Sequence, residues 1–190
     1  VIGWRSDIEN VPLPNIEDPD DLAAWSALHD DPADRPSPVA LGVEVSHDRK
    51  WTTIGLAGIR SDGRRYIQVV QAGRGTGWVP DRLAELQQTW KPAGVALVTS
   101  GPAGSLLAEL EQRRIRHLVT MSKADDGKAC GMFVDAVNEA TITHDDGRLL
   151  RISLEGATRP RSGDAWTIAP PADGSTDVSP LQACKNALYA

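Results

Sequence analysis

The chain has little cysteine, with only Cys130 and Cys184 among its 190 residues. Neither cysteine belongs to a CxxC pair or stands near a histidine at zinc-ligand spacing, so we interpret both as buried thiols. The sequence also lacks a run of about 20 apolar residues, the length that crosses a bilayer, and its start lacks the basic and apolar regions of a secretory leader. We therefore expect a soluble cytoplasmic protein with no membrane partner.

An excess of positive charge is absent as well, since the net charge is −6. The acids are unevenly distributed, however. Residues 1–37 hold nine acids and two arginines, whereas the remaining 153 residues carry 18 basic and 17 acidic side chains, a net charge of +1. DNA binding is therefore permitted, although the arginine clusters are equally typical of solvated faces. These clusters are Arg60, Arg64 and Arg65; Arg113, Arg114 and Arg116; and Arg148, Arg151, Arg159 and Arg161.

Nucleotide-binding and nucleophile motifs are missing too. The glycine-rich stretch 73–77 does not end in the Lys-Ser/Thr pair of a phosphate-binding P-loop. No Ser-His-Asp, Cys-His or dinucleotide-binding signature has a persuasive spacing. The chemistry must then come from other groups, and carboxylates are the remaining candidates.

Two regions follow from the pattern along the chain. Residues 1–37 are rich in Pro and Asp and predict an acidic linker around one short helix, which Asp18-Pro19 would start. Leu22, Trp25 and Leu28 recur at helical spacing and should dock on the domain that follows, residues 38–190.

The second region begins with strands and continues with alternating helices and short strands. An RNase H-like α/β fold, with a mixed central sheet flanked by helices, has this element order. The expected strands are 39–46, 51–59 and 65–72 in an antiparallel meander, then 95–100, 117–120, a short strand ending at 144, and 165–169. The expected helices are 79–90, one from 102, one from 122, 149–154, and one from 177 to 189.

Two acids are candidate metal ligands in such a fold. Glu44 lies in the middle of an apolar strand, where a carboxylate is costly to bury without a cation; the alternative is an outward-facing residue of a half-exposed strand. Asp177 opens the last helix, as an ordinary N-cap also would. Asp48 follows in the turn after Glu44 and either binds metal or forms the turn. Clustered carboxylates that hold two divalent cations about 4 Å apart hydrolyse phosphodiesters without a nucleophilic side chain.

His144 is a further candidate. It precedes Asp145-Asp146, and the three together resemble a metal cluster. The Asp-Asp-Gly that follows is equally typical of a turn and a helix cap.

From about Val39 onward the chain resembles the nuclease domain of phage terminase large subunits, of the type found in siphophages and prophages of actinobacteria. The order and spacing of four segments carry this resemblance: ALGVEVSHDR at 40–49, ACGMFVDAVNEATITHDDGRLL at 129–150, GATRPRSGDAW at 156–166 and TDVSPLQACKNALYA at 176–190.

The resemblance implies that Glu44 is the first metal-binding acid of the family and Asp177 the last, and that residues 1–37 follow a packaging ATPase domain. His144 corresponds to a histidine that often occurs there. The family ordinarily has another acid near the end of the fourth strand, where this chain has Thr99 and Ser100. Either of these binds metal through a water, or an acid from another loop substitutes, or the site holds one ion and cuts poorly.

The function expected from the resemblance is cleavage of concatemeric phage DNA by a Mg²⁺- or Mn²⁺-dependent endonuclease, with Arg148, Arg151, Arg159 and Arg161 on double-stranded DNA. The implied partners are the terminase ATPase domain, the small terminase and the portal, in the host cytoplasm. Two alternatives remain: a catalytically weak DNA-binding or assembly module of the motor, and another RNase H-like nuclease such as a resolvase.

Overall fold

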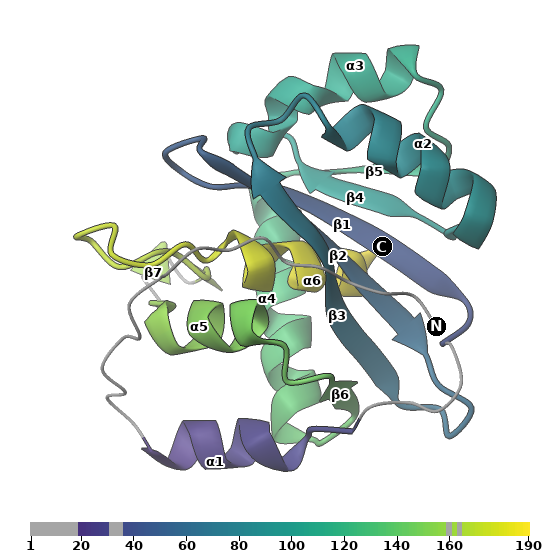
Figure 1. Cartoon of the computed structure of the whole chain (residues 1–190). Coiled ribbons are helices and arrows are strands. Elements are labelled where there is room, and N and C mark those ends of the chain that lie inside the picture. Colours follow the sequence, from purple (N-terminus) through teal and green to yellow (C-terminus); the bar gives the residue numbers. More distant parts are fainter. Residues whose placement is uncertain (1–18, 31–35, 159–160, 163–164) are drawn as a thin grey trace.

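The computed structural model describes residues 19–30, 36–158, 161–162 and 165–190. Its centre is a six-stranded mixed sheet in the order β5-β4-β1-β2-β3-β6, with helices on both faces (Figure 1). The strands are β1 (Val39–Val45), β2 (Trp51–Ile59), β3 (Arg65–Arg74), β4 (Val95–Val98), β5 (Leu118–Met121), β6 (Ile142–His144), β7 (Arg161–Ser162) and β8 (Ala165–Trp166). The helices are α1 (Pro19–Ala27), α2 (Val79–Trp90), the 3₁₀ helix η1 (Pro102–Leu106), α3 (Leu107–Gln112), α4 (Lys123–Asn138), α5 (Arg148–Gly156) and α6 (Ser179–Tyr189).

The sheet combines two kinds of pairing. Strands β1, β2 and β3 are antiparallel neighbours, which confirms the predicted meander. Strands β4 and β6 join its two edges in parallel, and β5 is parallel to β4. The mixed sheet with helices on both faces confirms the expected RNase H-like fold class.

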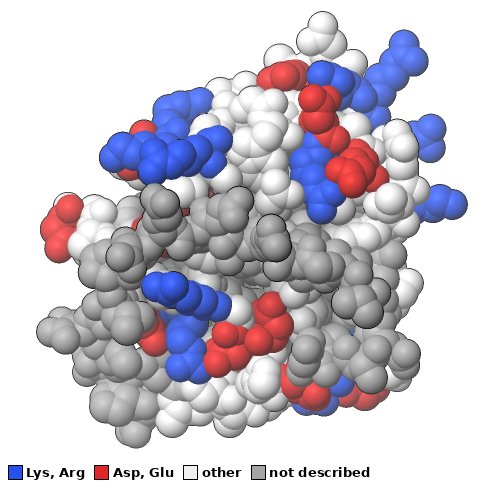
Figure 2. All heavy atoms as spheres, viewed as in Figure 1, with Lys and Arg blue, Asp and Glu red and all other residues white. Residues whose placement is uncertain are grey.

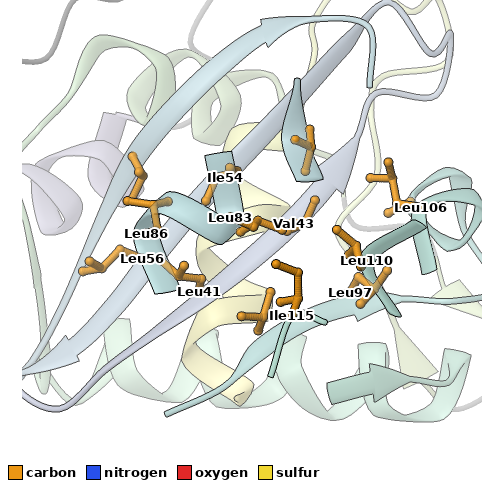
Figure 3. Close-up of a cluster of buried hydrophobic side chains, with 14 of the residues drawn as sticks. Leu41, Val43, Ile54, Leu56, Leu83, Leu86, Leu97, Leu106, Leu110 and Ile115 are labelled. Carbon is orange, nitrogen blue, oxygen red and sulfur yellow. The ribbon is translucent and has the colours of Figure 1, made fainter. Parts of the chain in front are cut away.

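One face of the sheet is apolar and carries α2, η1 and α3. Alternate residues of a strand point to opposite faces, and the odd-numbered residues of β1, from Val39 to Val45, are buried in this first cluster. Figure 3 shows Leu41 and Val43 among side chains from β2, β4 and the covering helices. The even-numbered residues of β1 therefore face the other side.

On that other side α6 lies directly against β1 and β2, because two paired glycines leave room for its backbone. Gly42 and Gly55 are cross-strand partners. A Cβ at Gly42 would stand 2.1 Å from the Ala183 carbonyl oxygen, and one at Gly55 would stand 2.5 Å from the Cys184 nitrogen. Glu44 follows Gly42 on the same face, so this close approach places Glu44 beneath α6.

Helix α1 packs on the same side of the sheet, in a second cluster with α4, α5 and α6. Trp25 is 1% exposed and Leu28 is also buried. The expected docking of this helix is confirmed for these two residues. The expected cap Asp18 and the side chain of Leu22 lie outside the described part of the chain.

The C-terminal third differs from the prediction in two places. The strand expected at 165–169 is only β8, which pairs with β7 in a separate two-stranded sheet. The last helix begins at Ser179, two residues after Asp177. Among the described residues, no helix combines the length and apolar character needed to cross a membrane.

Candidate active site

Glu44 is buried between the sheet and α6, with 5% of its surface exposed. Its Oε1 accepts a hydrogen bond from the Val45 backbone N–H at 3.1 Å, and its Oε2 accepts one from the Asn186 side-chain amide at 3.2 Å. Of the two orientations that the sequence left open, the structure shows the inward one.

Burial raises the pKa of Glu44 from 4.5 to about 7, and the nearby positive charge of Lys185 opposes part of this rise. Removing the carboxylate from water disfavours its charged form more than its hydrogen bonds restore it. Near neutral pH the side chain is therefore divided between its protonated and ionised forms, and a bound cation would favour the ionised one.

This pKa makes the stability of the fold depend on pH. Between pH 4.5 and about 7 the folded chain keeps a proton on Glu44 that the unfolded chain has lost, so the free energy of unfolding falls as the pH rises through this window. The loss amounts to about 3 kcal/mol at most. Glu44→Gln cannot ionise and should escape it.

The measurement is urea unfolding of wild type and Glu44→Gln at pH 5 and pH 8. The variant should gain stability relative to wild type at the higher pH, and contributions from all other groups cancel in this comparison. An identical stability difference at the two pH values would show that the Glu44 pKa is not raised.

Asp177 lies just before α6 and holds its first turn. Its Oδ1 accepts from the Ser179 backbone N–H and its Oδ2 from the Ser179 hydroxyl, both at 2.9 Å. Burial raises its pKa, and the negative charge of Asp48 adds to this rise. The N-cap of α6 is Val178, so Asp177 stands one residue before the cap position and forms a turn with Ser179, and it is partly exposed.

Two hydroxyls connect Asp177 to the Glu44 strand pair. The Ser179 hydroxyl, which donates to Asp177, lies 3.2 Å from the Thr53 hydroxyl. Thr53 is the cross-strand partner of Glu44, and such partners have Cβ atoms about 5 Å apart. The structure therefore brings Glu44, Thr53, Ser179 and Asp177 to one face of the sheet, where Thr53 lies at the first residue of α6 and Glu44 lies against Asn186 in its second half.

Asp48 lies in the exposed β1–β2 turn. It accepts hydrogen bonds from the Ser46 hydroxyl at 2.7 Å and the Lys50 backbone at 3.0 Å, and it forms an ion pair with Lys50 at 2.9 Å. The Lys50 contacts and then the Ser46 bond lower its pKa to about 2. Asp48 forms the turn, and its negative charge raises the pKa of Asp177.

No acid is present at the end of β4. Its last residue, Val98, follows the Val43–Leu97 pair in register and so lies beside Glu44. Thr99 and Ser100 are exposed in the turn beyond, where the Thr99 hydroxyl donates to the Met121 carbonyl at 3.2 Å. Within the described residues, no group of three or more His, Cys, Asp or Glu side chains is arranged to hold a metal ion.

His144 does not join this group. It ends β6, at the sheet edge and separated from β1 by β2 and β3. Its Nε2 lies 2.9 Å from the Trp25 carbonyl oxygen, its Nδ1 accepts from the Asp146 backbone at 2.9 Å, and its ring stacks on Trp25 at 3.8 Å. Both ring nitrogens are occupied, so His144 anchors α1 rather than neighbouring Glu44.

The expected DNA-binding arginines are only partly described. Arg148 is exposed on α5, and Arg151 forms an ion pair with Asp146. Arg159 and the side chain of Arg161 lie outside the described residues. Figure 2 shows acidic and basic side chains interspersed on the face in view, with basic ones gathered over the β1–β2 turn.

A scan against protein-family models finds no match, and a search of curated proteins finds none either. Solved structures do match. The large terminase of bacteriophage HK97 superposes with a TM-score of 0.72 at 11% identity, over 88% of this chain and 42% of that chain. The magnesium-bound large terminase nuclease of thermophilic phage G20c gives 0.65 at 12% identity, over 89% of this chain and 95% of that one. The large terminase nuclease domain of Thermus phage P74-26 gives 0.63 at 10% identity, over 88% and 93%.

The chain has the fold of phage large terminase nucleases. It spans under half of the HK97 large terminase and nearly all of the separate nuclease domains. At this identity the likeness concerns the fold, and the roles of individual residues rest on the geometry above.

Within this terminase-nuclease fold, three residues that act on Glu44 by a hydrogen bond or by charge went unnoticed in the sequence: Asn186, Lys185 and Asp126. Asn186 donates to Glu44, and Lys185 is 1% exposed and forms an ion pair with Asp126 of α4. A signal was present, because Lys185 lies four residues after the buried Leu181 and therefore on the buried stripe of α6. Its acidic partner is 59 residues away in sequence and could not be inferred from spacing.

Proposed function

We propose that the chain is the DNA-cutting nuclease domain of a phage packaging terminase, of the actinobacterial siphophage type, and that it hydrolyses phosphodiesters with Mg²⁺ or Mn²⁺. One observation carries the proposal: a buried acid on β1, Glu44, and a half-buried acid before α6, Asp177, share one face of a sheet with this fold. The bound magnesium of the G20c nuclease supports the choice of a divalent cation.

The donor chemistry suits one hard cation. Carboxylate oxygens are the ligands that Mg²⁺ and Mn²⁺ prefer, and Glu44 and Asp177 would hold the ion, with Asp48 adding negative charge nearby. Such an ion would lower the pKa of a bound water and neutralise charge on the scissile phosphate. The buried Thr53 and Ser179 hydroxyls would keep Asp177 in place through their hydrogen bonds.

Basic side chains near the same end of the sheet support DNA as the substrate. Arg49 in the β1–β2 turn donates to the Pro102 carbonyl and the Ser105 hydroxyl, which orders the turn against η1. At the end of β3, Arg74 lies over the Trp51 ring at 5.1 Å. With Lys50 these groups would contact the phosphates of double-stranded DNA without reading its sequence, and Arg148 and Arg151 would extend the contact along α5.

The proposed assembly is supported by the match to only 42% of the HK97 large terminase. A packaging ATPase domain would precede residues 1–37, and the small terminase and the portal would be further partners, in the host cytoplasm. The acidic residues 1–37 would then link the motor to the nuclease.

The test is nicking of supercoiled plasmid by this chain. We expect cleavage with Mn²⁺ or Mg²⁺, none with EDTA, and no sequence preference at the cut ends. Cleavage should be slow, because the net positive charge of residues 38–190 is small and residues 1–37 oppose it. EDTA-resistant cutting would refute the metal-dependent proposal.

A second candidate function is favoured by Val98, which lies beside Glu44 at the end of β4 where the resemblance would place a carboxylate. The chain would then bind DNA as an assembly module of the motor without efficient cleavage. The same assay separates the two functions when DNA binding is followed in parallel: retention of plasmid without any metal-dependent nicking would favour the module.

A further inference from the structure

A lysine is completely buried under the candidate site. Lys185 of α6 is 1% exposed, and its ammonium forms an ion pair with Asp126 in the first turns of α4. Lysine is almost never buried to this extent unless an anion accompanies it, because an ion loses its hydration when it enters the protein interior. A position this costly calls for a physical reason.

The same ammonium also acts on Glu44. Asn186, the next residue of α6, donates to Glu44 Oε2 at 3.2 Å, so this part of α6 lies over Glu44. The charge of Lys185 stabilises the Glu44 carboxylate, and the charge of Asp126 opposes it. The buried cation is therefore paired with Asp126 of α4 and also lies close enough to Glu44 of β1 to favour its charged form.

Two further buried groups lie on the same two helices, α4 and α6. Burial raises the pKa of the Cys130 thiol, one turn after Asp126 on α4, and the charge of Lys185 opposes this rise. The Asn186 Oδ1 atom is buried and has no hydrogen-bond partner among the described residues. Carboxylate and amide oxygens are the donor types that a divalent cation accepts, yet the Asp126 carboxylate is paired with an ammonium.

We infer that the Lys185 ammonium occupies the place of a second divalent cation, so that the site binds one metal ion and Lys185 is a positioning residue that holds Glu44 and Asp126. The inference rests on the proposed function. A divalent ion between Glu44 and Asp126 would lie against a buried positive charge, and the protein interior screens this repulsion poorly. The missing acid at the β4 end agrees with a single-ion site.

The decisive variant is Lys185→Ala, which removes the ammonium and leaves the Asp126 carboxylate without its partner. Mn²⁺ binding is measured by isothermal titration calorimetry without DNA, on the whole chain. We expect one bound ion for wild type and two for Lys185→Ala. The second should disappear in Lys185→Ala/Asp126→Asn, which lacks one carboxylate.

Lys128→Ala is the matched control. Lys128 lies on α4 and forms an ion pair with Asp125, next to Asp126, but it is exposed. Its removal also deletes one lysine from a lysine–aspartate pair, and it should leave a single bound ion. A second ion in Lys128→Ala as well would show that loss of any nearby positive charge suffices, which would overturn a specific role for Lys185.

A destabilised Lys185→Ala still permits the test by thermal unfolding. Mn²⁺ should raise the Tm of this variant more than that of wild type, because the ion replaces the missing ammonium. Equal Tm shifts, two ions bound to wild type, or one ion bound to a folded Lys185→Ala would each refute the inference. The proposed function has a separate test, because it fails if wild type binds no Mn²⁺ and cuts no plasmid. The inference about Lys185 is judged by the number of ions that Lys185→Ala binds relative to wild type, which requires no cleavage.

Discussion

Asp177→Asn is expected to slow metal-dependent plasmid nicking by about 100-fold or more, the scale of losses when a metal site loses a key group. The amide keeps the shape of the side chain, and its oxygen still accepts from the Ser179 backbone N–H that Asp177 now binds. The start of α6 should therefore persist. Only the negative charge offered to the cation is removed.

Asp173→Asn provides a matched control from the same loop. Asp173 accepts from the Ser175 backbone N–H at 2.9 Å, two residues ahead, just as Asp177 does from Ser179, but it is exposed. Its replacement should leave the nicking rate unchanged. An active Asp177→Asn, or an equal loss in both variants, would show that Asp177 does not hold the ion. Initial rates at saturating Mn²⁺ provide the comparison.

Gly42→Ala is expected to destabilise the fold by about 3 kcal/mol, the upper range for overpacking a tight interior. The added methyl would stand 2.1 Å from the Ala183 carbonyl oxygen and 2.5 Å from the Ala187 nitrogen. Both are backbone atoms of α6, so no side-chain rotation relieves the clash and the helix must move away from β1. Nicking should fall as well, because α6 carries the Asn186 partner of Glu44 and follows Asp177.

Gly131→Ala is the control for a glycine without such a neighbour. It lies within α4, and nothing stands within 4 Å of a Cβ placed there. Alanine should stabilise the helix by about 0.5–1 kcal/mol, because it loses less conformational freedom on folding. The measurement is urea unfolding of the three proteins at one pH. A Gly42→Ala variant as stable as wild type would mean that α6 does not pack directly on β1.

Local patterns were sufficient for most of the elements. The apolar runs of β1 to β3, separated by short polar turns, predicted an antiparallel meander, and the structure confirms it. A charged residue inside such a run, Glu44, was identified as costly to bury, and it is buried. Both inferences succeed because strand alternation and the cost of desolvation act over a few neighbouring residues.

The short C-terminal strand and the role of His144 were harder to predict. The pattern at 165–169 suited a strand, but its partner is β7, outside the main sheet. His144 beside two aspartates resembled a metal cluster, whereas its ring nitrogens contact the Trp25 carbonyl and the Asp146 backbone. The sequence near His144 contains no sign of Trp25, because that residue reaches it from α1, 119 positions earlier.

The sequence by itself determined the order of the elements, the acidic character of residues 1–37 and the presence of a carboxylate within an apolar strand. Each of these depends on residues close together in the chain. Only the tertiary structure decided which groups surround that carboxylate. Helix α6 packs on β1 and β2 over the paired Gly42 and Gly55, and this packing sets Asn186 against Glu44 and the next residue, Lys185, against Asp126 of α4. Contacts of this kind join residues 59 to 142 positions apart, and they form only when the packed sheet and helices fix where each side chain points.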